Sequence, residues 1–321
     1  MFNFKWHEGE DSRISLLPIK NPEIWEYKKK LESLHWTAQE IDLSADRNSW
    51  NTMTDDQKHF VIMQLAFFAT IDISVLDNID DNFSSEVNCL EARAVFAEQS
   101  AQEWIHTEGY GLQIEAVIEN EKERERIFNS ARTMPIITRM KEWVTKWFNR
   151  GLSIGERLIA FAAVEGVLFS ASFSSIQWLC ELRLLPGVTA FNEFIVRDEN
   201  VHTEFSCMLV SKYLKERPSQ EVAHAIFDEV IYIIDDFISE SISVSLIGLS
   251  VEDMRQYVRY QTDRVLEMLE YDAKFNVSNP FPFMDKLLLN DVSKTNFFEG
   301  RPTQYQMITK KEQSAFSLDD F

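Results

Sequence analysis

Residues 97–111 read AEQSAQEWIHTEGYG and place three reactive side chains on one side of a predicted helix. Glu103 and His106 lie one turn apart, and Tyr110 follows one turn later. A Glu-x-x-His pair presents a carboxylate oxygen and an imidazole together, which is how helical bundles hold iron or manganese. Whether this pair binds a metal depends on the further ligands that the rest of the chain can bring to it.

The composition favours an all-α fold. The 321 residues include only 9 glycines and 8 prolines, and a hydrophobic fraction of 45% is enough for a sizeable core. Long runs rich in alanine, leucine, isoleucine, phenylalanine, glutamate and lysine lack the alternation that is typical of strands. Helices are therefore expected at residues 22–34, 55–83, 88–118, 121–129, 136–149, 154–180, 188–215, 220–246 and 251–270.

The chain reads as one helical domain, because no repeat or flexible linker divides it. We expect an N-terminal lead over residues 1–20, a helical domain over residues 21–288 and a flexible C-terminal tail over residues 289–321. An irregular chain is expected after Pro280. The last residues, AFSLDDF, combine two phenylalanines and a leucine with acidic side chains, a pattern that suits docking into the groove of a partner.

The net charge and the cysteine content limit which binding partners and which cellular compartment are expected. A net charge of -20 disfavours both nucleic acid and anionic membranes as partners. Residues 158–180 contain one charged residue, Glu165, but also several serines, so they are interpreted as a buried helix and not as a membrane span. Three cysteines in apolar patterns and an N-terminus without a signal sequence predict a cytoplasmic protein with reduced thiols.

Two acids in apolar surroundings distinguish metal ligands from chance pairs. The Glu-x-x-His pattern occurs four times, at Glu32/His35, Glu103/His106, Glu199/His202 and Glu221/His224. Asp72 lies in QLAFFATIDISVL and Glu165 in RLIAFAAVEGVLF, and neither has a lysine or arginine one turn away. A charge in such a place costs several kcal/mol unless a cation compensates it. These two acids therefore mark the helices that face a metal.

Spacing assembles the ligands into two helical hairpins. Asp72 and Glu103 are 31 residues apart, with the turn-like DDNFSSEVN between them. Glu165 and Glu199 are 34 residues apart, with LLPGV between them. Chains folded back at these turns bring each acid level with the downstream pair, to within about one turn of ~5 Å. The predicted ligands of a carboxylate-bridged dimetal site in a four-helix bundle are Asp72, Glu103, His106, Glu165, Glu199 and His202.

Glu32/His35 has no upstream buried acid, and Glu221/His224 follows Pro218 in a polar first turn, so both pairs are expected at the surface or behind the metal ligands. A dimetal carboxylate site is compatible with iron storage or ferroxidase activity, with an oxygenase or desaturase acting on its own substrate, and with oxidation of a nearby side chain. A purely structural helical protein would bind no metal. Tyr110 favours side-chain oxidation, because its phenol lies on the metal-facing side and can lose one electron and one proton.

The chain closely resembles the small, radical-generating subunit of class I ribonucleotide reductase, particularly that of eukaryotes and large DNA viruses. The resemblance covers about residues 17–321 and rests on the motifs LHWTAQEIDLS, LAFFATID, EWIHTEGY, ERLIAFAAVEG, RDENVH, NPFPFM, KTNFFE and FSLDDF. It implies a ferritin-like helical bundle that forms a homodimer. It also implies a ribonucleoside-diphosphate reductase, active only with a large (alpha) subunit bound through the C-terminal tail, which converts ribonucleotides to deoxyribonucleotides.

The resemblance also assigns residues. In the family, the positions of the six ligands predicted above bind two iron ions per chain, with manganese possible, bridged by oxygen species. O2 reacts there, and the position of Tyr110 carries the radical. Asp198 would link Trp36 to His106, and Tyr305 in the tail would relay the radical to the large subunit. The family packs an apolar pocket around its radical, at positions that here are Phe169, Phe173 and Ile195.

The surroundings of Tyr110 depart from the family pattern. Gly109 and Gly111 flank this residue, whereas the eukaryotic type has bulkier side chains there. Glycine has no side chain beyond its α-carbon. We therefore expect free space on both sides of Tyr110.

Overall fold

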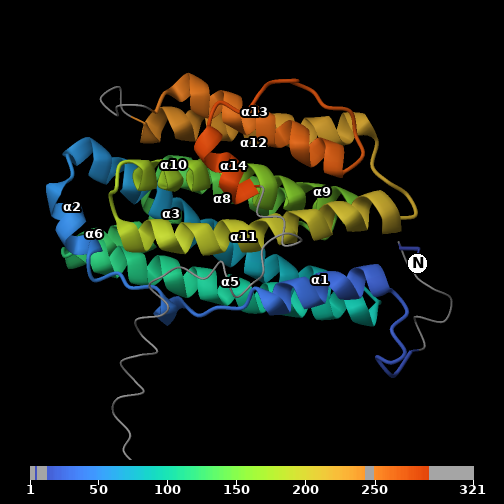
Figure 1. Cartoon of the computed structure of the whole chain (residues 1–321). Coiled ribbons are helices and arrows are strands. Elements are labelled where there is room, and N and C mark those ends of the chain that lie inside the picture. Colours follow the sequence, from blue (N-terminus) through green and yellow to red (C-terminus); the bar gives the residue numbers. More distant parts are fainter. Residues whose placement is uncertain (1–3, 6–12, 243–248, 289–321) are drawn as a thin grey trace, which may run out of the picture.

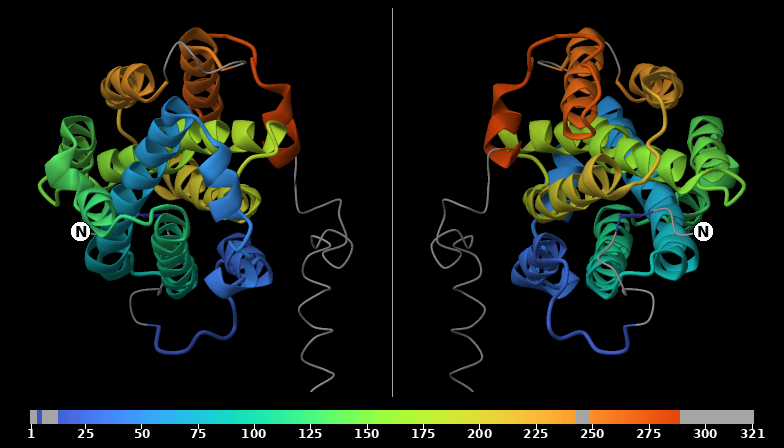
Figure 2. Two further views of the ribbon diagram at one scale, coloured as in Figure 1. Left: turned by 90° about the vertical axis from the view of Figure 1, so that its left-hand side faces the viewer. Right: turned by 90° about the vertical axis from the view of Figure 1, so that its right-hand side faces the viewer.

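The computed structural model describes residues 4–5, 13–242 and 249–288, and the predicted all-α fold is confirmed in them. Figure 1 shows long helices running side by side, and the end-on views of Figure 2 show them stacked as a bundle. An isolated bridge between Phe4 and Leu214 is the only β pairing within the described ranges. The predicted tail, residues 289–321, lies outside the described residues.

The first hairpin joins α3 (Asp55–Asn78) to α5 (Leu90–Val117). A capping box between Thr54 and Gln57 starts α3. The turn predicted at DDNFSSEVN was placed too early: a π-helical segment, η3 (Ile79–Phe83), continues α3, and the short α4 (Ser84–Glu86) follows it. The first and last side chains of η3, Ile79 and Phe83, are fully buried. Their burial stabilises this continuation of the helix past the polar residues between them. The chain reverses just before α5.

The second hairpin is built from α9 (Ile154–Ala163), the π-helical segment η4 (Val164–Leu168), α10 (Phe169–Glu181) and α11 (Pro186–Met208). It reverses at the predicted LLPGV turn, where Leu185 has a left-handed backbone (φ 49°) before the proline that opens α11. A third π-helical segment extends α11 over Leu209–Tyr213 (η5). The predicted helices 154–180 and 188–215 are therefore present, with their π segments unforeseen.

Further helices cover the two hairpins. They are α1 (Pro22–Ser33), η2 (Ala38–Glu40), α2 (Asp46–Thr52), α6 (Glu121–Phe128), α7 (Ser130–Thr133), α8 (Pro135–Trp147), α12 (Gln220–Ser241), α13 (Val251–Met268) and α14 (Pro282–Leu288). In Figure 1, α1 runs along α5, and α12 and α13 lie over α9 and α10. The expectation of an irregular chain after Pro280 is wrong for α14, which buries Met284 while the preceding Phe281 packs on Tyr257 at 5.4 Å between ring centroids.

The unpredicted α2 is tied to the second hairpin by Asp46. Its carboxylate accepts hydrogen bonds from the backbone N–H groups of Gly187 (2.8 Å) and Val188 (3.0 Å), at the start of α11. Unpaired N–H groups at a helix start favour a carboxylate there. Burial nevertheless raises the pKa of Asp46 to about 6. One short helix thus fixes the end of the element that supplies Glu199 and His202.

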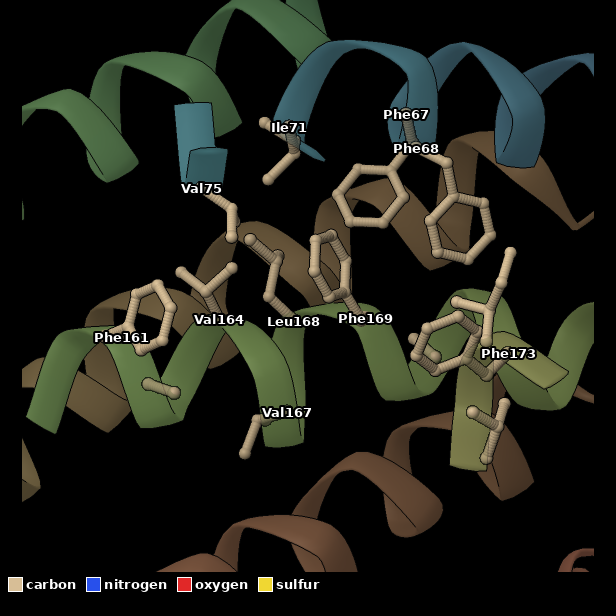
Figure 3. Packing of buried hydrophobic residues seen from close by; sticks show 14 of the residues in the cluster. Phe67, Phe68, Ile71, Val75, Phe161, Val164, Val167, Leu168, Phe169 and Phe173 are labelled. Carbon is tan, nitrogen blue, oxygen red and sulfur yellow. The ribbon is translucent and has the colours of Figure 1, made fainter. Parts of the chain in front are cut away.

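Two helical stretches, Asp55–Glu86 and Ile154–Glu181, are long and apolar enough to cross a membrane. In the windows that meet this criterion, 72% and 94% of the residues are buried inside the protein, so both are core helices. The interpretation of residues 158–180 as a buried helix agrees with this packing. Figure 3 shows the core between them, where Phe67 and Phe68 of α3 meet Phe169 of α10.

Candidate metal centre

The structure brings the six predicted ligands together inside the bundle. They come from α3 (Asp72), α5 (Glu103, His106), η4 (Glu165) and α11 (Glu199, His202). Every one of these side chains is buried. Candidate ligand atoms of Asp72, Glu103 and His106 lie within 4.8 Å of one another, and the same holds for Glu103, Glu165, Glu199 and His202. Because Glu103 belongs to both groups, the arrangement suits two adjoining metal ions that share a carboxylate.

Two carboxylates span the pair of imidazoles. Glu103 lies 3.3 Å from His106 Nδ1 through Oε2 and 3.1 Å from His202 Nδ1 through Oε1. Glu199 lies 3.0 Å from His106 Nδ1 through Oε1 and 3.1 Å from His202 Nδ1 through Oε2. Each carboxylate therefore faces both histidines with different oxygens. This is the geometry of two bridging carboxylates, and it presents the Nδ1 atoms as the metal-facing nitrogens.

The cluster carries more negative charge than its own residues compensate. Both side-chain oxygens of Asp72 and Oε2 of Glu165 are buried without a hydrogen-bond partner among the described residues. Burial, and then the neighbouring carboxylates, raise the pKa of Asp72 and of Glu165 well above their usual values. Burial lowers the pKa of His202, but Glu199 and Glu103 outweigh it and raise the value to about 9. Such a donor set fits divalent cations, which would neutralise the carboxylates.

The outer nitrogens of the histidines have defined partners. Nε2 of His202 lies 2.9 Å from Oε1 of Gln102, and Nε2 of His106 lies 3.3 Å from Oδ2 of Asp198. An acceptor behind the ring keeps the proton on Nε2 and leaves Nδ1 free for a metal. Sequence reasoning missed Gln102, because its neighbour Glu103 is the ligand and nothing in the pattern indicates where His202 points.

Trp36 joins the cluster through Asp198, the contact that the family resemblance implies. The indole Nε1–H donates to Asp198 Oδ2 at 2.7 Å, and the same oxygen lies beside His106. The Trp36 and His106 rings are 6.1 Å apart between centroids. Arg197 donates to the other carboxylate oxygen of Asp198 at 3.4 Å. Trp36, Asp198 and His106 thus form a continuous hydrogen-bonded connection from the cluster, whereas Tyr305 lies outside the described residues.

Tyr110 is buried close to the carboxylates. Its hydroxyl has no hydrogen-bond partner among the described residues. Burial, and then the charge of Asp72, raise the pKa of Tyr110 well above its usual value, so the phenol stays protonated. The ring stacks on Phe68, with 4.7 Å between centroids and an interplanar angle of 2°. Sequence reasoning missed Phe68, although it lies one turn before Asp72.

Phe169 and Phe173, at two of the positions where the family packs its apolar pocket, lie next to Phe68, the ring that stacks on Tyr110. The Phe169 and Phe173 rings lie 5.8 Å and 5.0 Å from the Phe68 ring between centroids, and Ile195 is buried. Figure 3 shows Phe68, Phe169 and Phe173 in the core. The expectation of free space at Gly109 is wrong, because a Cβ there would lie 2.7 Å from Cε1 of Phe191. A Cβ at Gly111 would meet nothing within 4 Å. The space left by one of the two glycines is therefore filled by a ring from α11.

A small cavity of about 30 Å³ borders the cluster on the side of Glu165 and Glu199. It extends to Tyr257 and Gln261 of α13 and to Met284 of α14. This volume holds a water molecule or a diatomic gas, but not a large substrate.

The two remaining Glu-x-x-His pairs lie away from the cluster. Glu32 and His35 are exposed, and Glu32 pairs with Lys28 and Lys29. Glu221 is exposed, and His224 contacts the backbone oxygen of Asp272 at 3.1 Å. Their predicted surface position agrees with the structure.

Known proteins share this chain's sequence and fold. The family model for the small chain of ribonucleotide reductase matches residues 13–280. The ribonucleoside-diphosphate reductase small chain of African swine fever virus is 44% identical over 321 residues, which cover 97% of this chain and 98% of that relative. The solved ribonucleotide reductase Rnr4 homodimer of Saccharomyces cerevisiae is similar with a TM-score of 0.78 at 29% identity, covering 88% of this chain and 90% of that one.

A more distant structure, the dimanganese(II)-NrdF protein of Streptococcus sanguinis, has a TM-score of 0.75 at 20% identity, covering 86% of this chain and 99% of that one, and it supports the fold. The African swine fever virus relative matches this chain over nearly the whole length of both, and its name agrees with the motifs in the sequence. The family binds a dimetal centre, and its members work as homodimers with a large subunit. The chain therefore belongs to the family of ribonucleotide reductase small chains, which are subunits of an oxidoreductase.

Proposed function

We propose that this small subunit forms a tyrosyl radical at Tyr110 and passes the oxidising equivalent to the large subunit, where ribonucleotides are reduced. One observation carries the proposal: Tyr110 is buried, hydrogen-bonded to nothing in the described structure, and electrostatically coupled to the carboxylate cluster through Asp72. A phenol in that position is shielded from water and from reductants. Burial disfavours both a charged phenolate and a charged phenol radical cation, so the electron and the proton would leave Tyr110 together.

The metal would be held by Asp72, Glu103, His106, Glu165, Glu199 and His202. Two iron ions per chain, oxidised by O2, would supply the oxidising equivalent when bound. Manganese is the alternative metal, since the Streptococcus sanguinis protein of the same fold is described as dimanganese(II). Both metals suit a ligand set of carboxylates and imidazoles. The unpaired oxygens of Asp72 and Glu165 support this assignment.

Transfer out of the subunit would use the connection behind His106. Asp198 holds both His106 and the Trp36 indole, so a proton can shift along these hydrogen bonds as an electron moves between the aromatic rings. Tyr305 and the tail, residues 289–321, would continue the path and dock the large subunit. The acidic and aromatic sequence AFSLDDF supports docking into an apolar groove with basic edges. We further propose that the subunit acts as a cytoplasmic homodimer.

The alternative, an oxygenase or desaturase acting on its own substrate, would need a channel for that substrate. Among the described residues, the cavity that borders the cluster at Glu165 and Glu199 has a volume of about 30 Å³.

Electron paramagnetic resonance tests the role of Tyr110. Metal-free protein would be loaded anaerobically with Fe(II), exposed to O2 and compared with a Tyr110→Phe variant treated identically. We expect a narrow organic-radical signal in the wild type and none in the variant, while both bind two metal ions per chain. A signal that survives in Tyr110→Phe would place the radical elsewhere. Two bound metals without any organic radical would favour an oxygenase or a metal-centred oxidant.

A further inference from the structure

We propose that Phe191 is a positioning residue for Trp36, and that Gly109 is a notch in α5 that admits its ring. This inference rests on the proposed radical path, because Trp36 matters for function only if that path is used. The contacts of Phe191 with Gly109 and with Trp36, together called the interlock, are a property of the fold and are testable without metal.

The notch explains why glycine occupies position 109. Gly109 is buried in the middle of α5, with ordinary helical geometry, so no unusual backbone angle requires glycine there. Glycine inside a helix is destabilising relative to alanine, because it loses more backbone entropy on folding. The compensating contact is Phe191, whose Cε1 and Cδ1 atoms would lie 2.7 Å and 3.0 Å from an added Cβ. Phe191 is itself fully buried, so the ring has little room to retreat.

The Phe191 ring also packs against Trp36. The two rings meet edge to face, with 5.6 Å between centroids and an interplanar angle of 65°. Phe194, one turn away on α11, contacts the indole as well at 5.2 Å. Edge-to-face contacts between buried aromatic rings stabilise a packing beyond the area that they bury. Phe191 therefore contacts both the backbone of α5 at Gly109 and the Trp36 indole.

Trp36 depends on such contacts because the backbone around it is irregular. It lies between α1 and η2, outside any helix. Its orientation is set by the hydrogen bond to Asp198 at 2.7 Å and by the rings of His106, Phe191 and Phe194. If Phe191 is replaced by a smaller side chain, one of the three aromatic contacts of the Trp36 indole is lost. The indole can then tilt, which lengthens the hydrogen bond to Asp198.

The interlock also ties Trp36 to the helix that carries His106 and Tyr110. Gly109 precedes Tyr110 directly and lies one turn after His106, so a displaced Phe191 ring acts on α5 and on the indole together. We infer that loss of the interlock slows transfer through Trp36 while the six ligand side chains, none of which contacts the notch in the interactions described above, still assemble.

Fluorine NMR on the metal-free full-length protein tests the positioning. Tryptophan would be replaced by 5-fluorotryptophan, and the Trp36 signal identified with Trp36→Phe. We expect Phe191→Leu and Gly109→Ala each to shift and broaden this signal, and the double variant to return it toward the wild-type position. Gly111→Ala is the matched control, because an added Cβ there meets nothing within 4 Å. Phe227→Leu controls for general loosening of the core, since Phe227 is fully buried but on α12.

Phe191→Met, whose flexible side chain fills an irregular gap more readily than leucine, replaces Phe191→Leu if the latter fails to fold. A Trp36 signal that stays in place in folded Phe191 and Gly109 variants, or that moves equally in Gly111→Ala, would overturn the proposal. With the large subunit present, we expect Phe191→Leu to lower turnover about tenfold to a hundredfold while the Tyr110 radical yield stays near that of the wild type. Absence of a Tyr110 radical in the wild type would refute the proposed function, but it would leave the fluorine result intact.

Discussion

His106 and His202 have different hydrogen-bond partners at the Nε2 atoms of their imidazoles, and this difference affects each imidazole as a metal ligand. Asp198 is a carboxylate and Gln102 a neutral amide, at 3.3 Å and 2.9 Å from the respective Nε2 atoms. A carboxylate makes the imidazole a stronger donor than an amide does. If His106 and His202 bind metal as proposed, the two metal positions would be inequivalent, and the position at His106 would have the more electron-rich nitrogen.

The Gln102→Leu variant removes the hydrogen-bond acceptor of His202 Nε2. Without an acceptor at Nε2, His202 can place its proton on Nδ1 and turn away from the metal position. We expect metal affinity at this position to fall about 10- to 100-fold, with the position at His106 much less affected. A stepwise anaerobic Fe(II) or Mn(II) titration resolves the two affinities. Gln113→Leu is the control, since Gln113 is also buried on α5 but donates to the Gly109 backbone oxygen. Equal weakening of both positions would contradict the assigned role.

At the scale of elements, the π-helical segment η4 decides how Glu165 enters the cluster. A π turn adds a residue to the helix and rotates the side chains that follow it, and such turns occur often at functional sites. Gly166 in this segment approaches Thr203 of α11 and Val265 of α13 so closely that a Cβ would lie 2.8 Å and 2.6 Å from their side chains. Close packing on both sides thus holds the backbone that presents Glu165.

The start of α5 is held by Glu91, which binds the N-terminal lead. Arg13 Nη1 donates to both carboxylate oxygens at 2.8 Å, the Lys20 backbone N–H donates at 2.8 Å, and Asn21 donates at 3.3 Å. Burial raises the pKa of Glu91, but the hydrogen bonds from Lys20 and Arg13 outweigh it and lower the value to about 2. The carboxylate also lies in the first turn of the helix, where negative charge is favoured.

Glu91→Gln is therefore expected to lower the free energy of unfolding at neutral pH by about 1–3 kcal/mol. Because the folded pKa is depressed from 4.5 to about 2, the stabilisation is present above pH 4.5 and is lost as the pH falls toward 2. Urea unfolding of metal-free protein at several pH values measures this difference. Glu115→Gln, at an exposed position of the same helix, should change stability little at any pH. A constant difference between Glu91→Gln and the wild type down to the lowest pH would refute the ionic contribution.

Assembly of the whole molecule with the large subunit is proposed to depend on the C-terminal tail. Deleting residues 315–321, AFSLDDF, removes the proposed docking segment and none of the cluster. We expect the truncated chain to lose binding to the large subunit while it keeps two metal ions and the Tyr110 radical signal. Surface plasmon resonance measures the first property, and metal analysis with electron paramagnetic resonance measures the others. A full-length chain with the last seven residues scrambled is the control for tail length. Undiminished binding by the truncated chain would place the docking surface elsewhere.

Much of the architecture follows from patterns along the chain. A helix buried on most of its faces appears as a long apolar run, and a carboxylate inside such a run is conspicuous because its charge needs compensation. That is why Asp72 and Glu165 could be selected, and why the two hairpins were foreseen from the distances between acids and Glu-x-x-His pairs. Family membership followed from the same short motifs.

Contacts between distant segments were not visible in this way. Gln102 behind His202, Phe68 on Tyr110 and Phe191 in the Gly109 notch each join residues on different helices, and no local periodicity indicates such pairs. The π segments and α14 depend equally on what packs against them. The sequence was sufficient to determine which residues are costly to bury, and these are among the residues proposed to bind the metal. The folded chain decided how the aromatic rings and Gln102 lie around these residues. Their positions depend on close packing between helices and not on the order of residues within one helix.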